Sequence, residues 1–103
     1  MAKQIIWSFK AQTDRKRILQ YWIERNQSKS YSQKLYRLFQ EAVRLIASYP
    51  NIGTPTSFGQ VRSKVVRDYQ IFYEEAGDAI HILTIWDSRQ DPEKLLQNLD
   101  RET

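Results

Sequence analysis

Two helical patterns, separated by only three polar residues, constrain the fold of this chain more than any other feature. Apolar residues recur every three or four positions over residues 11–23 and again over residues 31–49. The polar break at residues 27–29 is so short that the second helix has to run back along the first. The sequence therefore predicts an antiparallel helical hairpin.

The ends of both helices carry signals of their own. Ser8 is a favourable N-cap for the first helix, which we expect to end near Asn26. For the second helix we expect a capping box, in which Ser30 is the cap and Gln33 follows three residues later. Pro50 stops that helix, because proline cannot donate the next backbone hydrogen bond.

The rest of the chain has the pattern of strands and turns. A short apolar run at residues 5–7 precedes the first helix, and a loop rich in glycine and proline follows the second. Three further strand patterns lie at residues 61–67, 69–75 and 79–86. Residues 75–78 have the chemistry of a hairpin turn. The predicted order is β-α-α-β-β-β in one domain, residues 1–103: an α+β fold with the helical hairpin packed on one face of a small, mainly antiparallel sheet.

These strand patterns are partly apolar on both faces. Neighbours such as Ile71 and Phe72, or Ile82 and Leu83, point to opposite sides of a sheet. Two helices can cover only one side, so something else has to cover part of the other. A protein partner is the simplest cover. The alternative is a curled sheet that buries its own concave face.

The formal charge of +4 is unevenly distributed along the chain. Residues 1–49 hold ten basic and three acidic residues, a balance of +7, whereas residues 50–103 hold six basic and nine acidic residues, a balance of −3. This asymmetry indicates an anionic partner, either nucleic acid or an acidic protein segment. The alternative is that the charges only keep two helix faces solvated.

The composition argues against several kinds of site. The chain has no cysteine, so it has no disulfide, no thiolate metal site and no cysteine nucleophile. Its one histidine, His81, lies in the middle of a strand pattern, which argues against a catalytic triad or a His-rich metal site. We expect no cofactor, no metal and no membrane partner. Because there is no leader peptide or long apolar run, we expect the chain to be cytoplasmic.

Basic residues gather on and after the later strand patterns. Arg62, Lys64 and Arg67 lie on or beside one strand, and Arg89 follows the last strand. Arg62 and Lys64 have the same parity and should project from one face. Such groups suit phosphate binding and stabilisation of the phosphorane formed during RNA cleavage. The alternative is an edge strand kept soluble by its charges.

The last strand pattern ends in an aromatic ring and charged groups. Trp86 can meet a partner or can plug the end of the sheet. Arg89 can meet a target or can pair with Asp87 or Asp91. Asp91 followed by proline has the pattern of a helix start, which predicts a short C-terminal helix or tail.

Four stretches carry a resemblance to a known family: IIWSFKAQTDRKRILQYW, LIASYPNIG, VRDYQIFYE and ILTIWDSRQDPEKL. Their order and spacing over residues 4–96 resemble the RelE/ParE superfamily of type II toxins, and the phrase YQIFYE is closer to the ParE-like branch. The resemblance implies a compact α+β toxin of the plasmid-stabilisation type, covered by a cognate antitoxin that folds on binding. RelE-like members cleave messenger RNA in the ribosomal A site, whereas ParE-like members poison DNA gyrase.

The residues that support cleavage in RelE-like toxins match this chain only in part. Arg89 matches the basic position after the last strand, and Lys64 lies near the second-strand lysines. Gln70 stands where those toxins have an arginine on the third strand, and their C-terminal tyrosine falls at Lys94-Leu95. These departures argue against a nuclease.

We therefore predict a toxin that a cognate antitoxin neutralises and that inhibits DNA gyrase. The alternative is an endoribonuclease that cleaves mRNA on the ribosome, and a third hypothesis is an unrelated basic nucleic-acid-binding domain. We do not expect an enzyme; if the chain is one, it is a metal-independent endoribonuclease that uses Lys64, Arg67 and Arg89. The residues expected to bind the target are Arg62, Lys64, Arg67, Trp86, Asp87 and Arg89.

Overall fold

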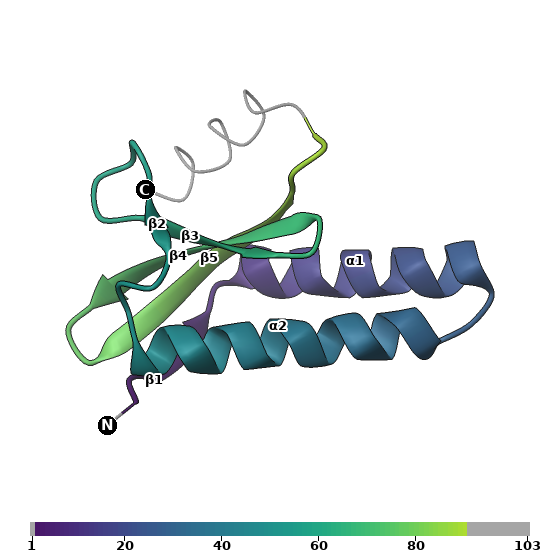
Figure 1. Cartoon of the computed structure of the whole chain (residues 1–103), viewed down its shortest axis with the longest axis horizontal. Coiled ribbons are helices and arrows are strands. Elements are labelled where there is room, and N and C mark those ends of the chain that lie inside the picture. The colour runs from purple at the N-terminus through teal and green to yellow at the C-terminus, as the bar shows by residue number, and fades with distance from the viewer. Residues whose placement is uncertain (1, 91–103) are drawn as a thin grey trace.

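The computed structural model describes residues 2–90, which form two helices on one face of a five-stranded sheet (Figure 1). The helices are α1 (Phe9–Asn26) and α2 (Ser30–Ser48). The strands are β1 (Gln4–Trp7), β2 (Thr54–Pro55), β3 (Arg62–Val66), β4 (Tyr69–Ala76) and β5 (Ala79–Asp87). Their order in the sheet is β1-β5-β4-β3-β2, with β1 parallel to β5 and the other pairs antiparallel. The predicted α+β fold, with its helical hairpin on one face of a mainly antiparallel sheet, is confirmed.

The segment between α2 and β3 differs from the prediction. It was expected to be a loop throughout, but Thr54 pairs with Ser63 and Pro55 with Arg62 to form β2. A strand of two residues has no period that a sequence pattern could reveal. The C-terminal helix expected from Asp91 lies outside the described residues. Within residues 2–90, no helix combines the length and apolar character that crossing a bilayer requires.

The two helices begin in different ways. Ser8 caps α1 as predicted, because its hydroxyl accepts the backbone N–H of Ala11 at 2.9 Å. The capping box expected at Ser30 is wrong. Ser30 is the first residue inside α2, and the Ser28 hydroxyl accepts its backbone N–H at 3.2 Å. Lys29 occupies the N-cap position and makes no side-chain cap hydrogen bond.

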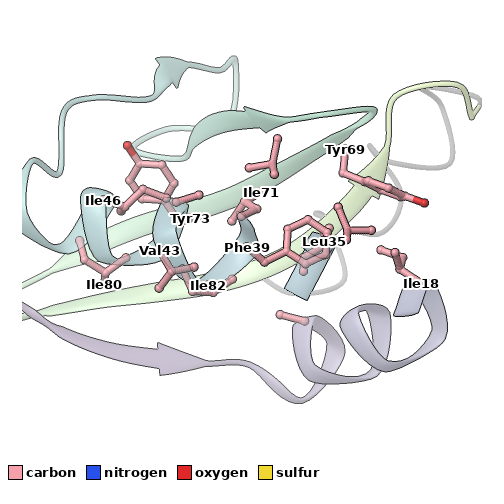
Figure 2. Close-up of a cluster of buried hydrophobic side chains, with 14 residues drawn as sticks. Ile18, Leu35, Phe39, Val43, Ile46, Tyr69, Ile71, Tyr73, Ile80 and Ile82 are labelled. Atoms are coloured by element: carbon pink, nitrogen blue, oxygen red, sulfur yellow. The ribbon is translucent and has the colours of Figure 1, made fainter. Parts of the chain in front are cut away.

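The main core lies between the helices and the sheet (Figure 2). The apolar stripe of α2 supplies Leu35, Phe39, Val43 and Ile46, and α1 supplies Ala11 and Ile18. The strands supply Ile71, Tyr73, Ile80, Ile82 and Ile85 from their helix-facing positions. Each large apolar side chain buried in this way contributes about 1.5–3 kcal/mol relative to exposure. This packing fixes the helical hairpin against the sheet.

Two tight turns set the register of the later strands. Val66 pairs with Tyr69 across a two-residue turn, in which Arg67 has a left-handed φ of 57°. The predicted turn after β4 is confirmed: Ala76 pairs with Ala79, and Gly77 takes the left-handed conformation. The turn at Gly77 sets the pairing of β4 with β5 as far as Tyr73 and Ile82, and an irregularity between Phe72 and Tyr73 then shifts the register by one residue, so that Phe72 pairs with Thr84.

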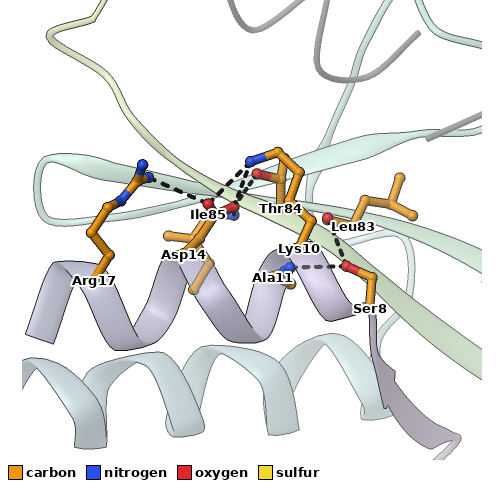
Figure 3. Close-up of polar contacts among 8 residues, drawn as sticks. All are labelled: Ser8, Lys10, Ala11, Asp14, Arg17, Leu83, Thr84 and Ile85. Atoms are coloured by element: carbon orange, nitrogen blue, oxygen red, sulfur yellow. Dashed lines mark hydrogen bonds and ion pairs between the residues drawn. The ribbon is translucent and has the colours of Figure 1, made fainter. Parts of the chain in front are cut away.

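A buried carboxylate joins α1 to the edge of β5 (Figure 3). Asp14 is only 2% exposed and accepts the backbone N–H of Ile85 at 3.2 Å and the hydroxyl of Thr84. Lys10 donates to the same carboxylate at 3.0 Å and Arg17 at 3.3 Å. Four donors therefore compensate the cost of burying this charge.

A second, smaller apolar cluster lies on the sheet face opposite the helices. Phe72 and Trp86 are buried there together with Val61, and Phe58 and Leu83 pack against them. Phe58 and Val61 come from the segment before β3, so the chain covers part of this face itself. Part of the cover is thus a loop of the same chain, which neither the partner nor the curled-sheet hypothesis had anticipated, whereas Ile6 on this face is 39% exposed.

Candidate functional site

A concave pocket lies at the end of the sheet, between α1 and the ends of β4 and β5. It has a volume of about 320 Å³. We call it the sheet-end pocket, and its lining residues are Arg17, Ile18, Tyr21, Tyr69, Asp87, Arg89 and Gln90. The β3–β4 turn is tied to the same end, because the backbone N–H of Ser88 donates to the carbonyl of Asp68 at 2.8 Å.

Asp87 and Arg89 form a bidentate pair at the rim of this pocket. Arg89 Nε lies 2.9 Å from Oδ1 of Asp87, and Nη2 lies 2.8 Å from Oδ2. The Arg89 backbone N–H also donates to Oδ1, at 2.9 Å. These hydrogen bonds lower the pKa of Asp87 and raise the pKa of Arg89. Of the two partners considered for Arg89, the structure shows Asp87, while Asp91 lies outside the described residues.

Tyr69 forms one wall of the pocket and is only 3% exposed. Its hydroxyl accepts the indole N–H of Trp22 at 2.8 Å. Burial raises the pKa of Tyr69 and outweighs the opposing effect of that hydrogen bond. The phenol is therefore protonated near neutral pH, so it can donate a hydrogen bond but cannot act as a general base.

Tyr73 is equally unsuited to that task. Its hydroxyl donates to the carbonyl of Pro50 at 2.6 Å and accepts the N–H of Gly53 at 2.9 Å. Burial also raises the pKa of Tyr73. A metal-independent ribonuclease needs a proton acceptor that titrates near neutral pH, and neither tyrosine of β4 provides one.

Arg62 and Lys64 project from the same face of β3, as predicted. They pair with Tyr73 and Ile71, which lie in the core, so this is the face that the helices cover. Arg62 donates to the carbonyl of Gly53 at 2.8 Å. Its guanidinium therefore holds the segment after α2, which is a structural role that the sequence did not reveal.

Lys64 and Arg67 lie beside α2 rather than at the sheet-end pocket. They line a second hollow of about 310 Å³, which we call the α2–β3 groove. Its other lining residues are Leu38, Glu41, Ala42, Leu45, Val65 and Val66. The structure thus divides the residues proposed for a ribonuclease between two hollows, with Arg89 in one and Lys64 and Arg67 in the other.

Trp86 lies on the opposite face of the sheet from both hollows. It is 7% exposed and packs against Val61 and Phe72. Its ring is part of the second apolar cluster, in agreement with the alternative that Trp86 fills the end of the sheet. Trp86 lines neither the sheet-end pocket nor the α2–β3 groove. A role of Trp86 in target binding stays a prediction.

Of the residues that line the sheet-end pocket, only Asp87 and Arg89 were among the predicted site residues, and the missed ones include Arg17 and Tyr21 of α1. They lie four residues apart on α1, so they share one side of that helix. Their spacing was visible in the sequence, but it does not say that α1 passes the end of β5. Within residues 2–90, no cluster of three or more His, Asp or Glu side chains is arranged to hold a metal ion.

Comparisons with known proteins agree with this architecture. Residues 5–92 match the family model described as the ParE toxin of the type II toxin-antitoxin system, parDE. The fold is similar to a solved structure described as the chromosomal ParDE TA system from P. aeruginosa, with a TM-score of 0.74 and 20% sequence identity. That similarity covers 84% of this chain and 96% of the other. No match was found among curated proteins. Since the family model spans most of the chain, this protein belongs to the ParE toxin family of type II toxin-antitoxin systems.

Proposed function

We propose that a cognate antitoxin neutralises this toxin and that the free toxin inhibits DNA gyrase. The match of residues 5–92 to the ParE family model carries the proposal. The geometry supports binding rather than RNA cleavage, because Lys64 and Arg89 line different hollows and burial raises the pKa of both Tyr69 and Tyr73.

The second sheet face also favours a binding function. The positions of β1, β3, β4 and β5 that face away from the helices include Ile6, Val65, Gln70 and Phe72. No lysine or arginine occupies such a strand position within residues 2–90. Cleavage of RNA on this face would require cations to stabilise the phosphorane, and these strands do not supply them.

For the antitoxin we propose the α2–β3 groove as the main docking surface. Leu38, Ala42 and Leu45 give it an apolar floor, while Lys64 and Arg67 add positive charge. β2 pairs with only Arg62 and Ser63, so the remainder of β3 has no strand beside it on that side within residues 2–90. An acidic segment that folds on binding can use all three features: apolar contacts for affinity, cations for steering, and main-chain hydrogen bonds along the strand.

Two assays on purified protein test the choice of target. We expect the toxin to abolish supercoiling of relaxed plasmid by gyrase, and addition of the antitoxin to restore it. On programmed ribosomes, primer extension should show no cuts in the A-site codon. Arg44→Ala, which removes a charge from an exposed position of α2, is the matched control for Lys64→Ala and Arg89→Ala. Discrete A-site cuts that disappear in Lys64→Ala or Arg89→Ala but persist in Arg44→Ala would replace gyrase with messenger RNA as the target.

A further inference from the structure

Three residues that line the sheet-end pocket carry hydrogen-bond donors that no described residue accepts. The Tyr69 hydroxyl accepts from Trp22 but donates no hydrogen bond within residues 2–90. Arg89 donates hydrogen bonds from Nε and Nη2 to Asp87, and its Nη1 donates none to the described residues. Among the described residues, Arg17 donates one hydrogen bond, from Nη2 to Oδ1 of Asp14 at 3.3 Å. Tyr69, Arg17 and Arg89, from β4, α1 and the segment after β5, therefore all line one hollow of about 320 Å³.

The two carboxylates next to these donors already accept hydrogen bonds from other groups. Both oxygens of Asp87 accept from Arg89, and both oxygens of Asp14 accept from surrounding donors. Among the residues that line the pocket, Arg17 and Arg89 stand against Asp87, an excess of one positive charge, and Asp68 at the β3–β4 turn also lies near enough to act on Arg89. A ligand that brings hydrogen-bond acceptors and a negative charge therefore matches the lining residues.

We propose that the sheet-end pocket binds the carboxylate of an acidic side chain, Asp or Glu, carried by a protein partner. The inference rests on the proposed function for the partner being a protein. A carboxylate at the end of a methylene stem can enter a hollow, with the stem against Ile18 and the carboxylate among the donors. The walls also suit a protein interface, where tyrosine and arginine are enriched among residues that dominate affinity.

The partner's other contacts would surround this anchor. Tyr21 is 46% exposed at the pocket wall and presents both an aromatic face and a hydroxyl. Gln90 follows the Asp87–Arg89 pair at the rim. The proposed anchor is therefore one acidic residue at a time, set in an apolar and polar rim, and a hexaglutamate peptide offers six candidates for that position.

An NMR titration with hexaglutamate peptide at low salt tests the pocket directly. We expect saturable shifts of the Arg17 and Arg89 Nε–H signals and of the Tyr69 and Gln90 amides. Arg89→Gln should weaken the apparent affinity about tenfold or more, because a hydrogen bond to a charged group is lost. Arg44→Gln removes the same charge from an exposed position of α2 and should change the affinity less than about twofold, because exposed single charges contribute little.

Tyr69→Phe separates hydrogen bonding from general charge attraction, because it removes the hydroxyl donor and leaves the charge unchanged. We expect it to weaken hexaglutamate binding while the amide spectrum stays that of the folded chain. Unchanged affinity in both Arg89→Gln and Tyr69→Phe would overturn the proposal. So would shifts spread over the basic residues of both helices, or saturation of the pocket by a DNA duplex and not by hexaglutamate. The titration needs neither antitoxin nor gyrase, so its failure is distinguishable from failure of the proposed function.

Discussion

The carboxylate of Asp14 accepts the backbone N–H of Ile85 at 3.2 Å, across 71 residues of sequence. β1 ends at Trp7, so at this height of the sheet a side chain of α1 supplies the acceptor that a neighbouring strand would otherwise provide. Arg17 contacts the same carboxylate and lines the sheet-end pocket. The buried contact and the pocket therefore share one helix side.

Replacing Asp14 by alanine should lower the free energy of unfolding by about 2–4 kcal/mol, because the Ile85 N–H and the Thr84 hydroxyl lose their buried acceptor. Urea denaturation followed by far-UV circular dichroism measures the change. Glu41→Ala, on the exposed side of α2, removes a carboxylate from a helix without such contacts and is the control. A loss no larger than that of Glu41→Ala would contradict a stabilising role for the Asp14 contacts.

Gly53→Ala should destabilise the fold by about 1–3 kcal/mol, as overpacking does. A Cβ at this position would lie 2.6 Å from the Tyr73 hydroxyl and 2.8 Å from the Ser63 carbonyl. Thermal unfolding gives the measurement. Gly59→Ala is the matched control, because its φ of +51° adds backbone strain but nothing lies within 4 Å of the new Cβ. We expect Gly53→Ala to lower the unfolding temperature more than Gly59→Ala. A larger decrease in Gly59→Ala would show that the neighbours of Gly53 move aside at little cost.

The Asp87–Arg89 pair should make stability depend on pH in the acid range. The hydrogen bonds from Arg89 lower the folded pKa of Asp87 below its ordinary value of 3.8. The contribution of ionised Asp87 to the free energy of unfolding is therefore fully present above the pKa that Asp87 has in the unfolded chain. It is lost as the pH falls through the lower pKa of Asp87 in the folded protein. Carboxyl-carbon NMR titration should show the depressed pKa of Asp87, and Arg89→Gln should return it toward 3.8. Arg44→Gln should leave it unchanged. An equally low pKa in Arg89→Gln would assign the shift to another cause.

Salt should act on antitoxin binding mainly through the association rate. Lys64 and Arg67 at the α2–β3 groove steer an acidic segment from a distance, whereas Leu38 and Leu45 hold it by short-range apolar contact. We expect surface plasmon resonance at rising salt to show slower association with little change in dissociation. If dissociation carried the whole salt effect, the charges would be holding the complex rather than steering it.

Local patterns predicted the elements of this fold well. The helices follow from apolar spacing, the turn at Gly77 from its residue types, and the common face of Arg62 and Lys64 from strand parity. The pairing of Arg89 with Asp87 was one of two partners considered, and two residues of separation are enough for that contact. All of these features depend on neighbours in the sequence.

The features that were missed depend on distant neighbours. Parity places Arg62 and Lys64 together but cannot say that their face is the one the helices cover; the register with Tyr73 and Ile71 decides that. Asp14 has the sequence context of an ordinary solvated helix residue, and its burial arises from where β1 stops. Without the position of α1 relative to β5, the sheet-end pocket could not be assembled from its parts.

The parallel pairing of β1 with β5 also determines when, during synthesis of the chain, the sheet can form. Gln4 pairs with Ala79 and Trp7 with Ile82, so β1 cannot form its hydrogen bonds until β5 has been synthesised. β5 is also the strand that separates β1 from β4. A growing chain on the ribosome can form the helical hairpin early, since its contacts are local, but it cannot close the sheet until β5 has left the exit tunnel. Until then both strands that flank β5 have unsatisfied edges, and a partially made toxin lacks the sheet-end pocket. The order of the strands therefore prevents the sheet and the sheet-end pocket from forming before β5 has been synthesised.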